Sequence, residues 1–161
     1  MNPFLAWLEA TDFSTWMRES PTVFAFPAIL SCHTVGMGLA AGINGALALR
    51  ILGVAPGVPL VEMKRFLSVM WFGFWLNFAS GVALLIAYPT KALTNPLFYV
   101  KLTLVAVAIA LVKPIGRRVF VEGDHPGDIK ALAIASLLCW SGVITSGRLL
   151  AYTYSRLMQG F

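Results

Sequence analysis

The sequence predicts an all-α integral membrane protein, a four-helix up-down bundle with an N-terminal interfacial helix. Of its 161 residues, 58% are hydrophobic and 12% are charged, whereas soluble domains contain about 25% charged residues. The mean hydropathy is +0.79. Four apolar runs approach or exceed the roughly 20 residues that a helix needs to cross a bilayer. We therefore expect a single membrane domain over residues 1–161, surrounded mainly by lipid.

The N-terminal segment, residues 3–17, precedes the apolar runs and reads PFLAWLEATDFSTWM. It places Trp7 and Trp16 near acidic residues. Aromatic and charged side chains mixed in this way are typical of a helix that lies in the membrane interface. We expect a short helix of that kind.

The four predicted spans are separated by segments rich in proline, glycine and charge, which break helices. Pro27 lies early in the first span, where it either kinks the helix or marks its true start. The third span is the shortest, and we expect flanking residues to complete its crossing. The spans cover about residues 22–49, 66–88, 97–112 and 131–154.

Basic residues are distributed unequally between the two sides of the predicted bundle. The first and third connections carry seven, against three to five on the opposite side, and cytoplasmic loops carry the excess of Lys and Arg. We expect a multi-pass protein of the bacterial inner membrane with both termini in the periplasm. Because these residues cluster at span ends and form no continuous basic face, no nucleic-acid partner is expected. The seven are Arg50, Lys64, Arg65, Lys113, Arg117, Arg118 and Lys130.

Small residues predict where the helices approach closely. Gly38 and Gly42 form a G-x-x-x-G pair in the first span, with Gly45 nearby. Such pairs allow helix backbones to come together in membranes. Gly73 and Gly81 are expected to act similarly on the second span.

Five polar residues lie inside the apolar spans, where lipid does not tolerate them. A charge at the centre of a membrane helix costs about 2.5 to 3.5 kcal/mol on insertion scales, so such residues usually face the bundle interior and often mark function. We expect these five side chains to face the bundle interior. They are His33, Asn44, Asn77, Lys101 and Arg148.

His33 lies near the middle of the first span, about 16 Å along the helix axis from Thr22. Its ring nitrogens need partners, because bare polar atoms in hydrocarbon cost several kcal/mol. An interhelical hydrogen bond to Asn77, Ser141 or Thr145 would satisfy them. An axial bond to haem iron, contact with a quinone, and copper binding are the functional alternatives.

The haem and copper interpretations differ in the ligands that they require. A bis-histidine haem b site needs a second histidine, and the only other, His125, lies in the third connection. Imidazole, thiolate and thioether are all ligands that suit Cu(I). Cys32, His33 and Met37 supply all three, although only His33 and Met37 share a helix face.

Lys101 and Arg148 each lie a few residues inside their spans, in the same third of the bilayer. Each side chain can snorkel separately to the interface. Alternatively, the two form a joint cradle for an anion, such as a haem propionate, a lipid phosphate or an acidic group of a partner.

Several phrases resemble a family of uncharacterised bacterial four-span inner-membrane proteins, distantly similar to copper-resistance D-type and b561-like membrane proteins. They are LALRILG, WFGFWLNFASGVALLIAYPTKALTNPLFYVKLTL and WSGVITSGRLLAY, within residues 28–153. The resemblance implies a four-helix architecture and a membrane-redox setting. The matching positions are His33, Arg50, Trp71, Gly81, Asn95, Pro96, Lys101, Gly147 and Arg148.

Three classes of function follow. The first is a small subunit or anchor of a membrane redox complex that contacts haem b or quinone through His33, with no catalysis of its own. The second is a structural or assembly partner of other membrane proteins, and the third is transport of copper or a small molecule. The predicted cofactor-binding residues are His33, Asn77, Lys101 and Arg148, with His33 as the metal ligand. The predicted partners are membrane lipid and either other membrane subunits or further copies of this chain.

Overall fold

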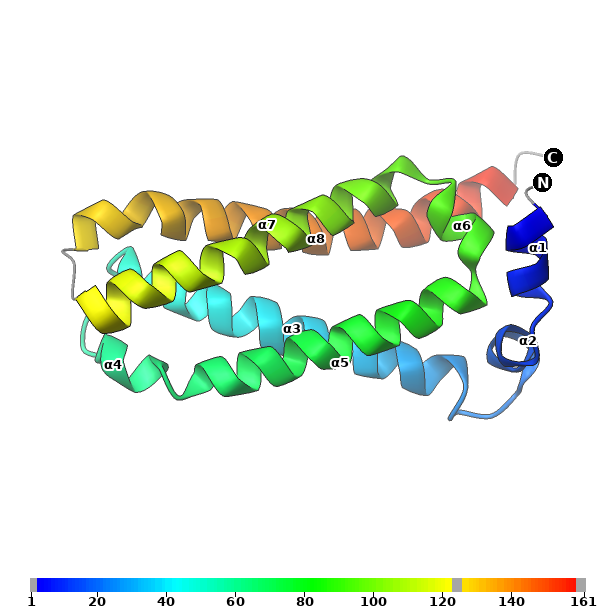
Figure 1. Ribbon diagram of the computed structural model, residues 1–161, viewed down its shortest axis with the longest axis horizontal. Coiled ribbons are helices and arrows are strands. Elements are labelled where there is room, and N and C mark those ends of the chain that lie inside the picture. The colour runs from blue at the N-terminus through cyan, green and yellow to red at the C-terminus, as the bar shows by residue number, and fades with distance from the viewer. Residues whose placement is uncertain (1–2, 123–125, 159–161) are drawn as a thin grey trace.

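The protein is an elongated bundle of long helices with two short helices across one end (Figure 1). The computed structural model describes the backbone of residues 3–122 and 126–158, and the side chains of residues 3–121 and 129–152. In chain order the elements are α1 Pro3–Glu9, α2 Asp12–Glu19, α3 Phe26–Ile51, α4 Leu60–Met63, α5 Phe66–Ala87, α6 Pro89–Leu93, α7 Pro96–Arg117, the π-helical turn η1 Arg118–Glu122, and α8 Pro126–Met158.

The predicted fold class is confirmed. Every regular element in the part of the chain that the structure describes is helical. Four stretches are long and apolar enough to cross a membrane. The chain is therefore a multi-pass membrane protein by length and composition. The four stretches are Phe26–Ile51, Leu60–Ala87, Pro96–Val121 and Ile129–Tyr152.

The first two long helices begin and end close to their predicted bounds. Helix α3 starts at Phe26, four residues later than expected, with Pro27 in its first turn. Proline is favourable there because the first N–H groups of a helix have no partner within it. Pro27 thus marks the start of the helix and does not kink it.

The third helix is longer than predicted. The run KPIGR after Val112 was expected to belong to a connection, but α7 continues through Pro114 to Arg117. Ile115, on this extension, is only 4% exposed and packs in the core with Leu47 and Ile51. Burial of that side chain offsets the hydrogen bond that a proline removes from a helix interior. Helix α8 is longer as well, beginning at Pro126.

Packing is uneven around the bundle. Helix α3 packs along both α5 and α8, and α7 packs along α8, whereas α5 and α7 do not form a packed pair within the described residues. Two buried clusters fill the middle and the end that carries α4. The end cluster is Leu47, Ala48, Ile51, Ile115, Ile129 and Ala133. The middle cluster is Ala40, Ala41, Ala108, Trp140 and Val143.

The closest helix contact includes Gly73, as predicted, but its partner on α3 is Gly36 and not the G-x-x-x-G pair. A Cβ on Gly36 would lie 2.6 Å from the backbone nitrogen of Asn77 and 2.7 Å from the carbonyl oxygen of Gly73. Gly38 and Gly42 face open space, because they lie two and six residues beyond Gly36, steps that turn the side chain by about 200° and about 240°. Helices α3 and α5 therefore meet at Gly36 and Gly73, and the predicted role of Gly38 and Gly42 within this chain is wrong.

In place of the one interfacial helix that was expected, the N-terminal segment forms two short helices, α1 and α2. They lie across the end of the bundle near α6 (Figure 1). Arg18 holds them there, donating hydrogen bonds to the carbonyl oxygens of Ala87 at 3.0 Å and Glu9 at 2.7 Å. The Glu9 carboxylate accepts a hydrogen bond from the backbone N–H of Thr90 at 3.2 Å. We call α1 and α2 the N-terminal cap, since they satisfy polar groups where α5 ends.

Candidate ligand cavity

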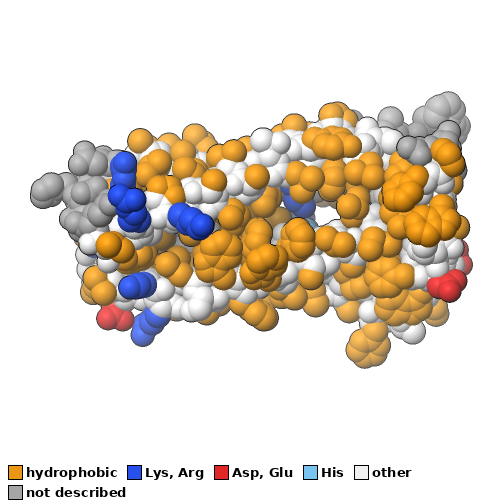
Figure 2. Space-filling view, in the orientation of Figure 1, with side chains coloured by type: hydrophobic (Ala, Val, Ile, Leu, Met, Phe, Trp, Pro, Cys, Tyr) orange, Lys and Arg blue, Asp and Glu red, His pale blue; other side chains and the backbone are white. Residues whose placement is uncertain are grey.

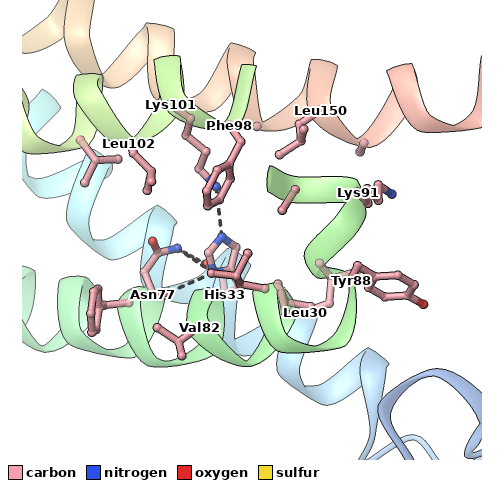
Figure 3. A pocket seen from close by; sticks show the side chains of 18 of the residues that line it. Leu30, His33, Asn77, Val82, Tyr88, Lys91, Phe98, Lys101, Leu102 and Leu150 are labelled. Carbon is pink, nitrogen blue, oxygen red and sulfur yellow. Dashed lines mark hydrogen bonds between the residues drawn. The ribbon is translucent and has the colours of Figure 1, made fainter. Parts of the chain in front are cut away.

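A cavity of about 580 Å³ occupies the half of the bundle nearest α6. Its walls come from α3, α5, α7 and α8, with α6 at one end, and they are mostly aliphatic and aromatic. Figure 3 shows side chains that line it, with His33 and Lys101 pointing toward each other and the ring of Tyr88 pointing away. The polar side chains on the walls are His33, Asn77, Tyr88, Lys91 and Lys101.

The cavity lies where α6 joins α5 to α7, two helices that do not form a packed pair within the described residues. Pro89 directly follows Tyr88, whose backbone leaves the helical region with φ −136° and ψ 58°. Pro96 then begins α7 after Asn95, whose side chain accepts a hydrogen bond from the N–H of Leu97 at 3.0 Å. Proline ends one helix and starts the next. The short α6 between them spaces the two long helices apart.

His33 is held by α5. Its Nδ1 lies 3.0 Å from the backbone oxygen of Asn77 and 3.2 Å from Oγ of Ser80. The Asn77 amide nitrogen also donates to the backbone oxygen of His33 at 2.7 Å. A carbonyl oxygen only accepts, so Nδ1 carries the proton in this arrangement. The other ring nitrogen, Nε2, is then an acceptor that faces the cavity.

Lys101 meets His33 from the opposite wall. Its Nζ lies 3.4 Å from Nε2 of His33, so the ammonium donates to the imidazole (Figure 3). A Cβ added to Gly147 on α8 would stand 3.8 Å from Nζ. No carboxylate among the described side chains lies within ion-pair distance of this ammonium. The arrangement therefore places a cation in an apolar cavity with a neutral partner.

Arg148 does not join Lys101. Its side chain is exposed, with the guanidinium 6.0 Å from the ring centre of Tyr152. Gly147, the preceding residue, is the one that faces Lys101, and one step along a helix turns the side chain by about 100°. The predicted joint cradle of Lys101 and Arg148 is therefore not formed, and Arg148 lies outside the cavity.

The residues considered for copper are also separated. Met37 packs against the middle cluster, and Cys32 is exposed on the outside of α3. Of the alternative hydrogen-bond partners for His33, Thr145 donates to the backbone oxygen of Ser141 on its own helix. The second histidine, His125, lies outside the described residues.

Two residues of the site were not predicted from the sequence: Ser80, which contacts His33 Nδ1, and Lys91, which lines the cavity. Ser80 lies three residues after Asn77, a spacing that puts both on one helix face, so a search for polar neighbours of Asn77 would find it. In the sequence, Lys91 is one of the basic residues on the side of the bundle opposite the first and third connections. It lines the end of the cavity with Tyr88, whose ring centre lies 5.8 Å from its Nζ. Burial lowers the pKa of Lys91 below its ordinary value.

Comparison of the chain with protein-family models, with curated proteins and with solved structures finds no match. The resemblance noted in the sequence stays a prediction. The chemistry of the cavity is therefore the main guide to function.

Proposed function

We propose that the protein is a membrane-embedded subunit of a redox complex, and that it binds a quinone in the cavity with the head group at His33 and Lys101. The observation that carries this proposal is the facing pair of Lys101 ammonium and His33 imidazole inside apolar walls, with Nζ and Nε2 3.4 Å apart. A quinone head group is a flat apolar ring with carbonyl oxygens that accept hydrogen bonds. It complements a donor surrounded by hydrocarbon.

The donor set fits a carbonyl ligand. A lysine ammonium has three donors, and the structure gives His33 Nε2 as the polar partner of one of them. The others are available to a carbonyl oxygen. Phe78 and Phe98 supply aromatic surface on the walls. The volume of about 580 Å³ lies within the roughly 300 to 1,000 Å³ of small-molecule sites.

Haem b is the second candidate, and one observation favours it. Nδ1 of His33 is oriented by a backbone carbonyl, as in many metal-bound histidines, and Nε2 is left to coordinate. However, Nε2 faces Lys101, and the described walls supply no second histidine, methionine or cysteine. The residues present therefore fit a quinone better than a six-coordinate haem.

We further propose that the protein resides in a bacterial inner membrane with the α6 end toward the periplasm. Most basic side chains on the face shown in Figure 2 gather at the α4 end. An excess of Lys and Arg is typical of the cytoplasmic side of a membrane protein. The subunit role rests on the proposed quinone, which would exchange electrons with a redox partner. Its electron-transfer partner would be another membrane protein.

The test is ligand binding to purified protein in nanodiscs. Short-tailed ubiquinone and menaquinone analogues should quench tryptophan fluorescence saturably. Lys101→Met and His33→Leu should each weaken binding at least about tenfold, a change of 1.4 kcal/mol. Arg148→Met is the matched control, and it should bind as the wild type does.

Other outcomes would decide against the quinone. A Soret band in the wild-type absorption spectrum that is lost in His33→Ala would favour haem. Saturable binding that is unchanged in both cavity variants would place the quinone elsewhere. If the protein binds neither quinone nor haem, the result would favour the role of a structural or assembly partner.

A further inference from the structure

The cavity opens on one side of the bundle, between α5 and α7. Three wall residues on α5 and α7 are also exposed on the outside of the molecule: Phe78 is 54% exposed, Val82 40% and Leu102 49%. Two wall residues on other helices are exposed as well, namely Leu30 on α3 and Ala151 on α8. Figure 2 shows this face hollowed, with a basic side chain visible in the hollow. We call the opening bordered by Phe78, Val82 and Leu102 the portal.

Two other directions are closed. Toward α4, where α3 packs against α8, the middle cluster fills the bundle. At the α6 end, Pro89 is fully buried, Ala92 is 9% exposed, and the N-terminal cap is fixed by Arg18. Because α5 and α7 do not form a packed pair within the described residues, the portal is a route between the cavity and the surroundings.

The portal opens into lipid and not into water. Phe78, Val82 and Leu102 all belong to membrane-spanning stretches. Lys101, beside the portal, lies five residues beyond Pro96, about 7.5 Å along the axis of α7. A molecule that enters here must already be dissolved in the bilayer.

The same geometry constrains what a bound molecule looks like. A head group at Lys101 and His33 lies inward of the portal. A chain attached to that head group can leave between α5 and α7, where the exposed wall residues are Phe78, Val82 and Leu102. These are apolar side chains, which favour a hydrocarbon chain over a polar one.

We infer that the portal is a lateral entrance for an amphiphile with a long isoprenoid tail, and that the tail stays in the portal when the head group is bound. This inference rests on the proposed quinone site and deepens it. It assigns recognition of the tail to Phe78, Val82 and Leu102, and recognition of the head group to His33 and Lys101. A water-soluble quinone lacks the part that the portal contacts.

The experiment compares a tail-less quinone with one that carries three isoprene units, in nanodiscs of fixed lipid composition. The measured quantity is the ratio of their dissociation constants, first in the wild type and then in Val82→Trp and Leu102→Trp. Partitioning into lipid affects every protein equally and cancels when the ratios are compared. Val107→Trp is the control, since Val107 is exposed on α7 outside the cavity walls.

The preference for the tailed quinone should fall at least tenfold in both portal variants, while binding of the tail-less quinone changes less than about twofold. Val107→Trp should keep the wild-type preference. If a tryptophan variant does not fold, as judged by thermal melting, Val82→Phe and Leu102→Phe replace it. As a second readout, a quinone with a photoreactive tail should label α5 and α7 at the portal, and excess unlabelled quinone should prevent labelling.

Unchanged preference in the portal variants would overturn the inference and leave the quinone site intact. Equal loss of both ligands would also overturn it, since Val82 and Leu102 would then contact the head group. Failure of the wild type to bind either quinone would overturn the proposed function, and the portal with it.

Discussion

The two halves of the bundle use the same four long helices in opposite ways. In the half near α4, Leu47, Ile51 and Ile115 are at most 5% exposed and close the interior. In the half near α6, the interior is a cavity that contains an imidazole and an ammonium. The difference indicates that one half provides the packing that holds the helices together. The other half can then remain hollow.

The crossing of α3 and α5 links the two halves, and we expect a substitution at this crossing to have the largest effect on the stability of the bundle. Gly36→Val would place side-chain atoms against the backbone of α5, where even a Cβ stands 2.6 Å from the Asn77 nitrogen. We expect a loss of at least about 3 kcal/mol, the upper part of the range for overpacking. Thermal or denaturant unfolding in detergent measures it.

Gly42→Val is the control for this crossing, because Gly42 faces open space. It should change stability by less than about 0.5 kcal/mol. Equal destabilisation by the two variants would contradict the contact between α3 and α5 at Gly36.

Truncating one side chain in each half tests the comparison directly. Ile115→Ala removes a side chain that is 4% exposed in the packed half, and should cost about 2 to 5 kcal/mol. Leu150→Ala enlarges a cavity that already exists, and should cost less than about 1 kcal/mol. If Leu150→Ala were as costly as Ile115→Ala, the two halves would be equally packed.

The hydrogen bond between α3 and α5 should contribute less. Asn77→Leu removes the amide that donates to the backbone oxygen of His33 at 2.7 Å. Interhelical hydrogen bonds in membranes average about 0.6 kcal/mol and reach about 1.7, so we expect a loss near 1 kcal/mol in unfolding experiments. Thr145→Ala removes a bond within one helix and serves as the reference. A gain in stability for Asn77→Leu would show that the bond is not formed.

The orientation of the two halves can be tested without affecting stability. With Cys32 and Cys139 changed to serine, Gly123→Cys places one thiol in the connection before α8. We expect no reaction with a membrane-impermeant maleimide in intact cells and full reaction after lysis. Labelling in intact cells would place the α4 end outside.

The four spans could be predicted because long apolar runs have few alternatives to membrane helices. Asn77 was one of three hydrogen-bond partners predicted for His33, since a ring nitrogen in lipid requires a partner and few polar residues were available. The C-terminal end of α7 was not predicted, because a proline usually ends a helix. Only the burial of Ile115 in the folded bundle shows why α7 continues past Pro114.

The cavity itself could not be predicted from the sequence. It depends on the spacing of α5 and α7, which α6 sets through its position in three dimensions. Lys101 and Arg148 lie at similar depths, yet only the rotation of α8 decides that Gly147 faces Lys101. Depth can be counted along a sequence, but the direction of a helix face relative to its neighbours cannot.

The N-terminal cap makes the timing of membrane insertion matter. Arg18 and its acceptor Ala87 are separated by 69 residues. At typical synthesis rates of 5 to 20 residues per second, Ala87 is synthesised roughly 3 to 14 s after Arg18. During that interval α1 and α2 have no docking surface. They dock only after both α3 and α5 have crossed the bilayer as an antiparallel pair, so a docked cap marks a correctly inserted first hairpin.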